Sequence, residues 1–269
     1  MQEKIAFEKF LFGDGKEIGI EDMDFCVNRI IMLIRIRPHH LEKAVKLSIE
    51  YSKFADFRRN LLEKSNECPV VINRLFKKRV FIFEEIEPFL RNDNTFLGCY
   101  YFRKEIDDFE SIIRTKKRPR DYDESFFENE NDLDQLIEYG YHPSSIEYCL
   151  KYDVIDDLLK MNNLNRNAKR SPFEWSIQPA DLDLLSFSGF FGSIKCFKHL
   201  LMKEFDINDK VRSMIVCSGC FDLFHLCQGT LFVTPNLFCN ASEFFHLPLL
   251  TFMIENGVEI NATNADIEQ

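Results

Sequence analysis

The sequence is poor in the residues that sheet-rich folds and nucleic-acid surfaces need. Its 269 residues include ten glycines, nine prolines and one tryptophan. A β-sandwich or barrel needs many turns, and therefore more glycine and proline, so an all-α fold is favoured. The net charge is −10. We expect no broad nucleic-acid surface, because duplex binding rests on basic patches.

Long apolar runs are also missing. No run of about 18 apolar residues, the length that spans a bilayer, is present, so no membrane span is predicted. The N-terminal segment MQEKIAFEKF is mixed in charge and lacks the apolar core of a signal peptide. We therefore expect a cytoplasmic protein. Its nine cysteines, an odd number, are then expected to be reduced thiols rather than a disulfide framework.

The sequence is rich in phenylalanine and in helical periodicity. Apolar residues make up 45% of the chain and include 28 phenylalanines, which is ample for a core. Apolar positions recur at spacings of three and four, for example at Leu41, Ala44, Leu47 and Tyr51. Residues 1–20 are predicted to be a flexible tail, and residues 21–114 a helical N-terminal region.

Composition changes after this region. A basic cluster, KKRPR at 116–120, runs directly into an acidic stretch, and residues 115–132 are predicted to be a charged linker or exposed loop. Short basic runs of this kind occur in nuclear-import signals as well as on ordinary surfaces. Nuclear entry therefore stays open beside a cytoplasmic location.

The best-defined stretch lies at 184–208 and reads LLSFSGFFGSIKCFKHLLMKEFDIN. Its apolar positions predict a short helix up to Phe191 and a second helix from Ser193. Gly192 stands between them, where one helix ends and the next begins at once, and this favours a residue that tolerates positive φ. One helix pair buries too little apolar surface to be stable alone, so neighbouring units are required.

Similar units are predicted on both sides of this stretch, within residues 133–269. Gly219 aligns with Gly192 at a shift of 27 residues (219 − 192), and Asn261 aligns with Asn208 at a shift of 53 (261 − 208). A degenerate earlier copy has Asp153 at the glycine position. The four units are placed at about 144–162, 183–208, 211–228 and 240–261.

This pattern resembles the ankyrin repeat, a family built of helix pairs joined by short turns. In that family a glycine ends the first helix, paired leucines end the second, and an asparagine closes the loop that follows. The positions that match in this chain, and that the resemblance makes structural, are Gly192, Leu200, Leu201, Asn208, Gly219, Gly257 and Asn261. The opening tetrad at 183–186, DLLS, lacks the proline and the histidine of the family.

Over about residues 40–260 the chain is similar to the divergent ankyrin-repeat families of parabasalid protists such as Trichomonas. The segments CPVVINRLFKKRVFIFEEIEPFL, PSSIEYCLKYDVIDDLL and FFGSIKCFKHLL carry the likeness. The resemblance implies a helical solenoid and a non-catalytic scaffold for protein–protein interaction. The sequence stops where a further repeat would begin, and either a truncated member or one that docks its open end on a partner would explain this.

Arrays of this kind bind through their outward loops and the exposed side of their first helices, which form a concave surface. Charged and apolar groups are mixed there, which suits a protein partner, and the negative net charge favours one with basic patches. The partner itself is unidentified. The residues expected on this surface are Ser186, Phe190, Lys203, Glu204, Asp206, Arg212, Ser213, Asn256 and Glu259.

The alternative is a zinc-binding or thiol-dependent protein. Cys217, Cys220, His225 and Cys227 include the two-residue cysteine spacing of zinc sites, although no second CxxC or HxxxH pair completes it. A thiol hydrolase would need one cysteine beside a histidine in a cleft, and the pattern singles out none of the nine. We therefore expect no cofactor, no metal and no catalysis.

Overall fold

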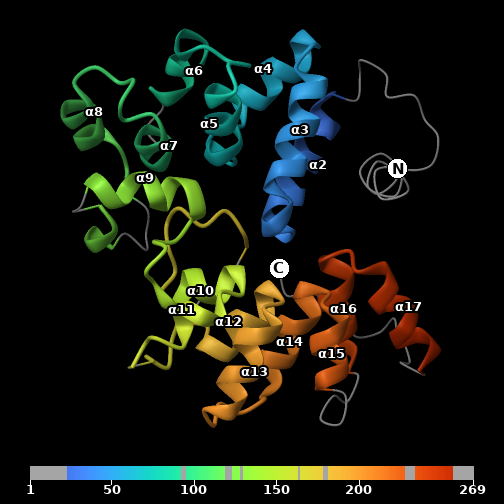
Figure 1. Cartoon of the computed structure of the whole chain (residues 1–269). Helices are drawn as coiled ribbons and strands as arrows, with labels where there is room; N and C mark the ends of the chain where they lie inside the picture. Colours follow the sequence, from blue (N-terminus) through green and yellow to red (C-terminus); the bar gives the residue numbers. More distant parts are fainter. Residues whose placement is uncertain are drawn as a thin grey trace. The chain divides into compact units, whose positions relative to one another are not determined.

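The computed structural model of the protein describes residues 23–91, 95–118, 123–127, 130–162, 164–177, 181–227 and 234–256. In these ranges the regular elements are helices, apart from one isolated β-bridge between Asn167 and Asp183 (Figure 1). The predicted all-α class is confirmed. Within the same ranges, no helix has the length and apolar character needed to cross a membrane. The predicted tail at 1–20 lies outside the described residues.

The chain forms two compact units, each with its own apolar core. Of the described residues, the first contains those up to Gly140 together with 171–177, and the second contains those from 141 to 170 and from 181 onward. The sequence places residues 133–139 with the repeats, whereas the structure places them in the first unit. The reason is that Leu133, Leu136 and Ile137 are buried in the core of that unit.

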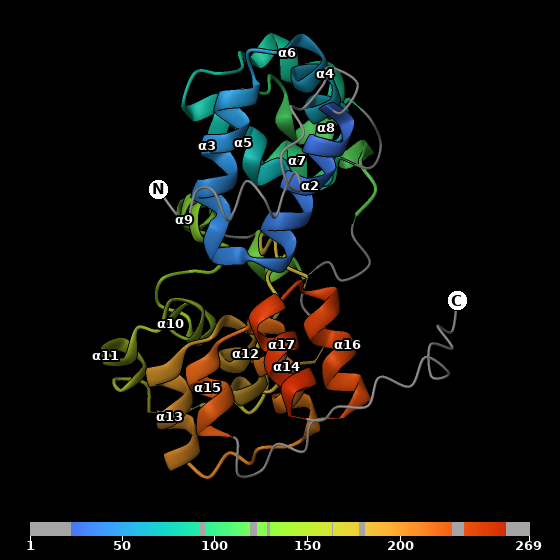
Figure 2. The same ribbon diagram turned by 90° about the vertical axis from the view of Figure 1, so that its right-hand side faces the viewer.

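The first unit consists of short helices in two rows. Its elements are α2 (Met23–Ile36), η2 (Pro38–His40), α3 (Leu41–Tyr51), α4 (Ala55–Glu63), α5 (Pro69–Lys77), α6 (Phe83–Leu90), α7 (Phe96–Tyr101), α8 (Phe109–Thr115), η3 (Glu124–Phe126) and α9 (Glu130–Tyr139). Helices α3, α5 and α7 pack in sequence along one row, and α2, α4 and α6 along the other (Figures 1 and 2). The first row repeats at intervals of 28 and 27 residues (69 − 41 and 96 − 69).

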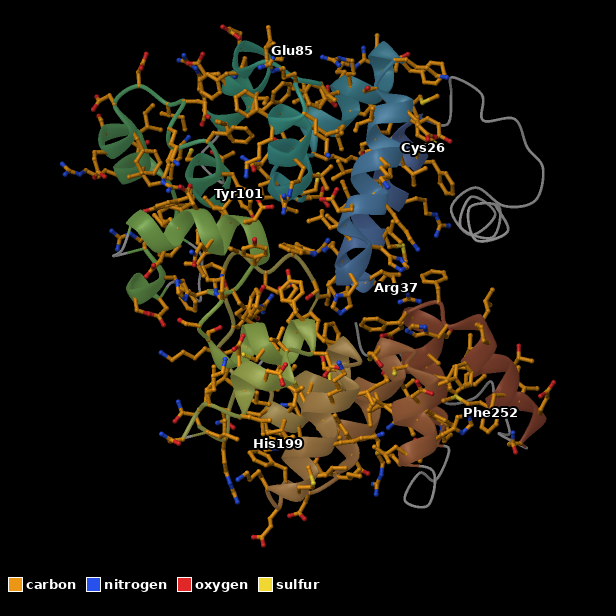
Figure 3. All side chains as sticks on the ribbon, in the orientation of Figure 1. Cys26, Arg37, Glu85, Tyr101, His199 and Phe252 are labelled. Atoms are coloured by element: carbon orange, nitrogen blue, oxygen red, sulfur yellow. The ribbon has the colours of Figure 1, made fainter. Side chains whose placement is uncertain are left out.

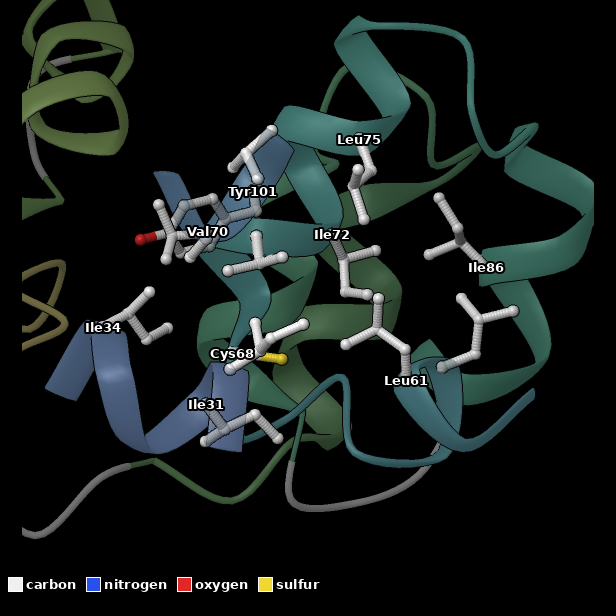
Figure 4. Close-up of a cluster of buried hydrophobic side chains, with 14 of the residues drawn as sticks. Ile31, Ile34, Leu61, Cys68, Val70, Ile72, Leu75, Ile86 and Tyr101 are labelled. Carbon is white, nitrogen blue, oxygen red and sulfur yellow. The ribbon is translucent and has the colours of Figure 1, made fainter. Parts of the chain in front are cut away.

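The core of the first unit lies between these rows. Its fully buried side chains include those of Leu61 on α4, Ile72 and Leu75 on α5, and Ile86 on α6. Figure 4 shows these side chains converging. Helix α5 begins at Pro69, since proline at the first helical position lacks only a donor that a helix start leaves unpaired. These apolar contacts hold successive helix pairs together.

The segment predicted to be a charged linker is partly packed against this core. Lys116, the first residue of the basic cluster, is buried, and its Nζ donates a hydrogen bond to the Leu90 carbonyl oxygen at 2.7 Å. Phe127 places its ring 4.6 Å from that of Tyr100, measured between centroids. Because Lys116 caps the end of α6, this lysine is not available to an import receptor in the folded protein.

The 171–177 segment also belongs to the first unit. Phe173 is buried in the first core, and the Trp175 Nε1 donates to the Pro38 carbonyl oxygen at 3.2 Å. The fluorescence of Trp175, the one tryptophan of the chain, therefore reports on the unfolding of the first unit.

Ion pairs hold α9 within the first unit. Glu138 accepts hydrogen bonds from Arg74 and from Lys77, the latter at 3.0 Å. Partial burial raises the pKa of Glu138, but the hydrogen bonds from Lys77 and Arg74 outweigh it and hold the pKa below its usual value. The hydrogen bond from Lys104, at 2.6 Å, lowers the pKa of Asp134 despite partial burial.

These carboxylates predict a loss of stability in acid. Because their folded pKa values lie below the unfolded ones, they stabilise the unit above the unfolded pKa of about 4 and lose that effect as pH falls through the folded pKa. The urea midpoint of Trp175 fluorescence should stay level near neutral pH and drop below about pH 4. Glu138→Gln should weaken the unit near pH 7 and flatten this dependence. Glu110→Gln, at an exposed position of α8, serves as control; an equal effect of both changes would contradict the assignment.

The second unit is a stack of helix pairs. Its described helices are α10 (Ile146–Tyr152), α11 (Ile155–Leu158), α12 (Leu184–Phe191), α13 (Ile194–Met202), α14 (Asp209–Ser218), α15 (Phe221–Leu226), α16 (Pro235–Glu243) and α17 (Leu247–Glu255). The first helices of successive pairs pack side by side, α10 against α12, α12 against α14 and α14 against α16 (Figure 1). The described pairs overlap the predicted units at 144–162, 183–208, 211–228 and 240–261, but α14 begins at Asp209 and α16 at Pro235, before the predicted starts.

A single left-handed residue joins the two helices of each described pair. The φ angles are +56° at Asp153, +69° at Gly192, +66° at Gly219 and +52° at Phe245. At Gly192 the following N–H, of Ser193, donates to the Ser188 carbonyl oxygen five residues back, at 3.0 Å, as in a Schellman motif. The positive φ predicted at Gly192 is confirmed.

Asp153 shows how a non-glycine residue fills this position. Its carboxylate accepts hydrogen bonds from the backbone N–H groups of Cys196, at 2.9 Å, and Lys195, at 3.2 Å. Both groups lie at the start of α13, where a negative charge is favourable. The joint of one pair is thereby hydrogen-bonded to the next pair, and aspartate tolerates the left-handed region better than most residues.

The joint at Gly219 is filled by a ring from the following pair. His246, just before α17, is buried, and its Nε2 lies 2.7 Å from the Cys217 carbonyl oxygen. A Cβ on Gly219 would lie 2.0 Å from atoms of that imidazole. Glycine is required here for its φ angle and for the close approach of His246.

The other predicted structural positions are placed as follows. Leu200 is fully buried in the second core, and Leu201 packs against it. Asn208 is the N-cap of α14, where its side-chain oxygen accepts from the Val211 N–H at 2.9 Å. Gly257 and Asn261 lie outside the described residues.

Candidate functional site

A hollow of about 410 Å³ opens in the second unit beside the loop between α13 and α14. Two parts of the chain form it: residues from the segment at 164–183 that precedes α12, and the loop itself. Its lining residues are Leu164, Arg166, Asn167, Asp183, Lys203, Glu204, Phe205, Asp206 and Asn208. It thus contains three of the residues predicted to bind a partner, those at 203, 204 and 206.

One wall of the hollow is a short antiparallel pair of extended segments. The Ala168 N–H donates to the Leu182 carbonyl oxygen at 2.8 Å, and the Leu184 N–H donates to the Arg166 carbonyl oxygen at 3.0 Å. These bonds flank the bridge at Asn167. They fix residues 166–168 beside the segment that leads into α12, and they hold Arg166 and Asn167 at the hollow.

The other wall is the loop after α13. Glu204, with a φ of +63°, turns the chain out of the helix. Phe205 and Ile207 then pack against the core, whereas Asp206 and Asn208 are exposed. This alternation points every second side chain outward, as in a strand. The acidic side chain of Asp206 therefore lies on the solvent side.

Four charged side chains at the hollow are uncompensated. Arg166, Lys203, Glu204 and Asp206 are exposed, and none of them makes a side-chain hydrogen bond or ion pair with another described residue. Asp183 differs, because its carboxylate accepts from the Ser186 N–H at 2.7 Å. The four charges can therefore pair with a ligand without first breaking a contact within the chain.

A second hollow of about 410 Å³ lies in the first unit, and charged side chains of its lining are paired with one another. It is lined by α5, the turn after α7 and α9, and its lining includes Lys77, Arg103, Lys104, Asp134 and Glu138. Asp134 bonds to both Arg103 and Lys104, and Glu138 bonds to Lys77. Its charges already compensate one another, so the hollow in the second unit is the better candidate for binding.

Two of the predicted partner-binding residues are not on the surface, and the prediction is wrong for them. Ser186 is 0% exposed and Phe190 is 3% exposed. Helix α12 lies between α10 and α14, and all of its residues are buried. Neither residue can contact a partner of the folded protein.

The remaining predicted residues lie apart from the hollow. Arg212 and Ser213 are half-buried on α14, and Arg212 pairs with Asp209 on the same helix at 2.5 Å. Asn256 is exposed and donates to the Phe252 carbonyl oxygen at 2.8 Å. Glu259 lies outside the described residues. Arg166 and Asn167 were not predicted as binding residues, because their segment carries no repeat pattern.

The cysteine cluster does not form a metal site. Within the described residues, which include Cys217, Cys220, His225 and Cys227, no three histidine, cysteine or acidic side chains are placed to hold a metal ion. Cys217 is buried at the end of α14, whereas His225 is exposed on α15. The ring of His225 lies 6.0 Å from that of Phe252. Figure 3 labels Phe252, which lies on α17.

The buried thiols are poor nucleophiles. Burial raises the pKa of Cys149 and of Cys227 to about 11, and that of Cys68 to about 12. Burial also raises the pKa of Cys196. Because the thiolate is the reactive form, these four cysteines are unreactive near neutral pH.

Thiol labelling tests this arrangement. Cys239 is exposed and Cys220 is half-buried, while the other seven cysteines are buried. We expect a thiol-exchange reagent to modify one thiol rapidly in the folded protein and all nine after denaturation. Cys239→Ser should remove the rapid phase, and Cys220→Ser should leave it. A rapid phase of several thiols would contradict the buried cores.

No family model matches the chain, and no curated protein or solved structure is significantly similar to it. The resemblance to ankyrin repeats therefore stays a prediction from the residue pattern.

Proposed function

We propose that the protein is a non-catalytic scaffold for protein–protein interaction, built on divergent ankyrin-like repeats, and that the hollow beside the loop at 203–208 binds its partner. The observation that carries the proposal is the group of uncompensated charges Arg166, Lys203, Glu204 and Asp206 around that hollow. Charges left unpaired within the chain suit complementary charges on a partner, which contribute to specificity and association rate.

The repeat architecture supports this choice. The second unit stacks helix pairs through their first helices, with a left-handed residue between the helices of each described pair. The loop at 203–208 leads from the second helix of one pair to the first helix of the next, which is where arrays of this kind present their outward loops. A loop held on a packed stack is a common place for recognition residues.

The lining of the hollow also favours binding over catalysis. Among its described lining residues, none is a cysteine or a histidine. Glu204 and Asp206 share the loop wall, and Asp183, on the opposite wall, is engaged as the N-cap of α12. The negative net charge of the chain favours a partner with basic patches.

Affinity capture from the native cell with the full chain as bait tests the proposal. Proteins retained by the wild type should be lost from the triple variant Lys203→Ala, Glu204→Ala, Asp206→Ala. A control triple variant, Lys198→Ala, Asp222→Ala, Glu243→Ala, removes the same three types of charge at exposed positions away from the hollow. This control variant should retain the proteins that the wild type captures.

Two further readouts sharpen the result. Capture should weaken with added salt, because exposed charges are screened beyond about 8 Å at physiological ionic strength. A photo-crosslinking residue at position 203 should join the captured protein directly, and one at position 243 should not. Identical capture by the wild type and both triple variants would rule the proposal out.

A further inference from the structure

The side chains of the loop at 205–208 alternate as in a strand, and no strand lies beside this loop among the described residues. Phe205 and Ile207 are half-buried, and Asp206 and Asn208 are exposed. The backbone N–H groups of Asp206, Ile207 and Asn208 have no hydrogen-bond partner among the described residues. An extended segment with unpaired N–H groups is a template for pairing with another chain.

The opposite wall offers a second unpaired backbone edge. In the antiparallel pair before α12, the bonded groups are those of Arg166 and Ala168. Backbone groups of successive residues in a strand point to opposite sides, so the N–H and C=O of Asn167 point away from the segment at 182–184. Asn167 and the loop both line the hollow. Two unpaired edges therefore border the same space.

The side chains around these edges indicate the charge of the occupant. Asp206 projects from the strand-like segment, and Glu204 lies two residues before it at the turn. Two cations, Lys203 and Arg166, also line the hollow. The chain as a whole carries −10. A basic side chain on the occupant would meet two acidic groups that lack a partner within the described chain.

We propose that an extended peptide segment of the partner protein binds this hollow by adding a strand to residues 206–208, with a lysine or arginine beside Glu204 and Asp206. The inference rests on the proposed function and names the mode of recognition. Main-chain hydrogen bonds to the unpaired edge supply affinity, and the side chains around it supply specificity. The segment at 205–208 is short, so the backbone bonds and the ion pair act together.

Selection from a random peptide library against the full chain provides the probe. Selected peptides should be rich in lysine and arginine and poor in proline. The double variant Glu204→Lys, Asp206→Lys should bind them about tenfold more weakly or worse, since like charges then face each other. The control Asp222→Lys, Glu243→Lys makes the same change of charge at exposed sites away from the hollow and should bind normally.

Backbone recognition is tested on the best selected peptide. N-methylation of its amides, one at a time, should abolish binding at every second position, because alternate N–H groups of a strand face one neighbour. Hydrogen exchange at 206–208 should be fast in the free protein and slow by about tenfold or more with the peptide bound.

Each other outcome counts against the inference. It is overturned if no peptide is selected, if binding ignores the Glu204 and Asp206 changes, or if the N-methyl scan shows a helical period. Capture of cellular proteins that still depends on residues 203, 204 and 206 would then leave the proposed function standing. Capture that ignores these residues would remove both.

Discussion

Replacing Gly219 by alanine is expected to lower the free energy of unfolding of the second unit by about 2–5 kcal/mol. A residue with a Cβ costs about 1–2 kcal/mol in the left-handed region that Gly219 occupies, with φ of +66°. The added methyl group would also lie 2.0 Å from His246 ring atoms, and such overpacking costs about 1–3 kcal/mol. Urea unfolding followed by far-UV circular dichroism measures the loss.

Gly192 supplies the matched control. Its φ of +69° is nearly the same, but a Cβ there would meet the Cys220 Cβ at 3.3 Å. Gly192→Ala should therefore cost about 1–2 kcal/mol for the conformation, with only a slight shift of Cys220 in addition. Hydrogen exchange in α14–α17 should rise more for Gly219→Ala than for Gly192→Ala. Equal losses in the two variants would mean that His246 does not occupy the joint.

A double change separates the two causes. His246→Ala removes the ring and its hydrogen bond to the Cys217 carbonyl oxygen. In that background Gly219→Ala should lose only the conformational part, so the two changes should be non-additive, as expected for residues in contact. Strict additivity would contradict the packing of the imidazole against Gly219.

Phe190→Ala is expected to destabilise the second unit by about 3–5 kcal/mol, the usual cost of removing a buried aromatic side chain. Phe190 is 3% exposed, and its ring centroid lies 5.1 Å from that of Phe191 and 6.1 Å from that of Phe244. The first of these rings is on α12 and the second follows α16. Removing Phe190 therefore opens a cavity between stacked pairs.

If Phe190 lay on the surface, as the sequence predicted, the opposite result would be expected. Phe190→Ala would then weaken partner binding and leave the urea midpoint unchanged, as is expected for Lys203→Ala at its exposed site. The two variants are best measured together, by urea midpoint and by partner capture. Wild-type stability of the Phe190→Ala protein would contradict the burial of this residue and indicate that it lies on the surface.

The position of the hollow separates its proposed binding role from the stacking of the helices. Its charged residues lie on loop segments, whereas Leu200 and Phe197 of α13 are fully buried and hold that helix in the stack. Changes at Lys203, Glu204 or Asp206 should therefore alter binding without unfolding the unit. Changes at the joints should do the reverse.

Sequence alone determined the local features of this protein. Spacings of three and four predicted the helices, and a glycine between two helical patterns predicted the left-handed joint at Gly192, because both depend on neighbours within a few residues. Asn208 matched a family position whose asparagine closes the loop, and in the structure it caps α14. Local alignment also predicted four repeat units, and their ankyrin character stays a prediction.

Only the tertiary structure decided which faces are covered. Periodicity groups residues on one side of a helix but does not say how many neighbours that helix has, so the burial of Ser186 and Phe190 required the contacts of α12 with both α10 and α14. The pairing of His246 with Gly219, the capping of Leu90 by Lys116 and the walls of the hollow each join residues far apart in the chain. Such contacts leave no periodic signal, because they depend on how separate elements come together in space.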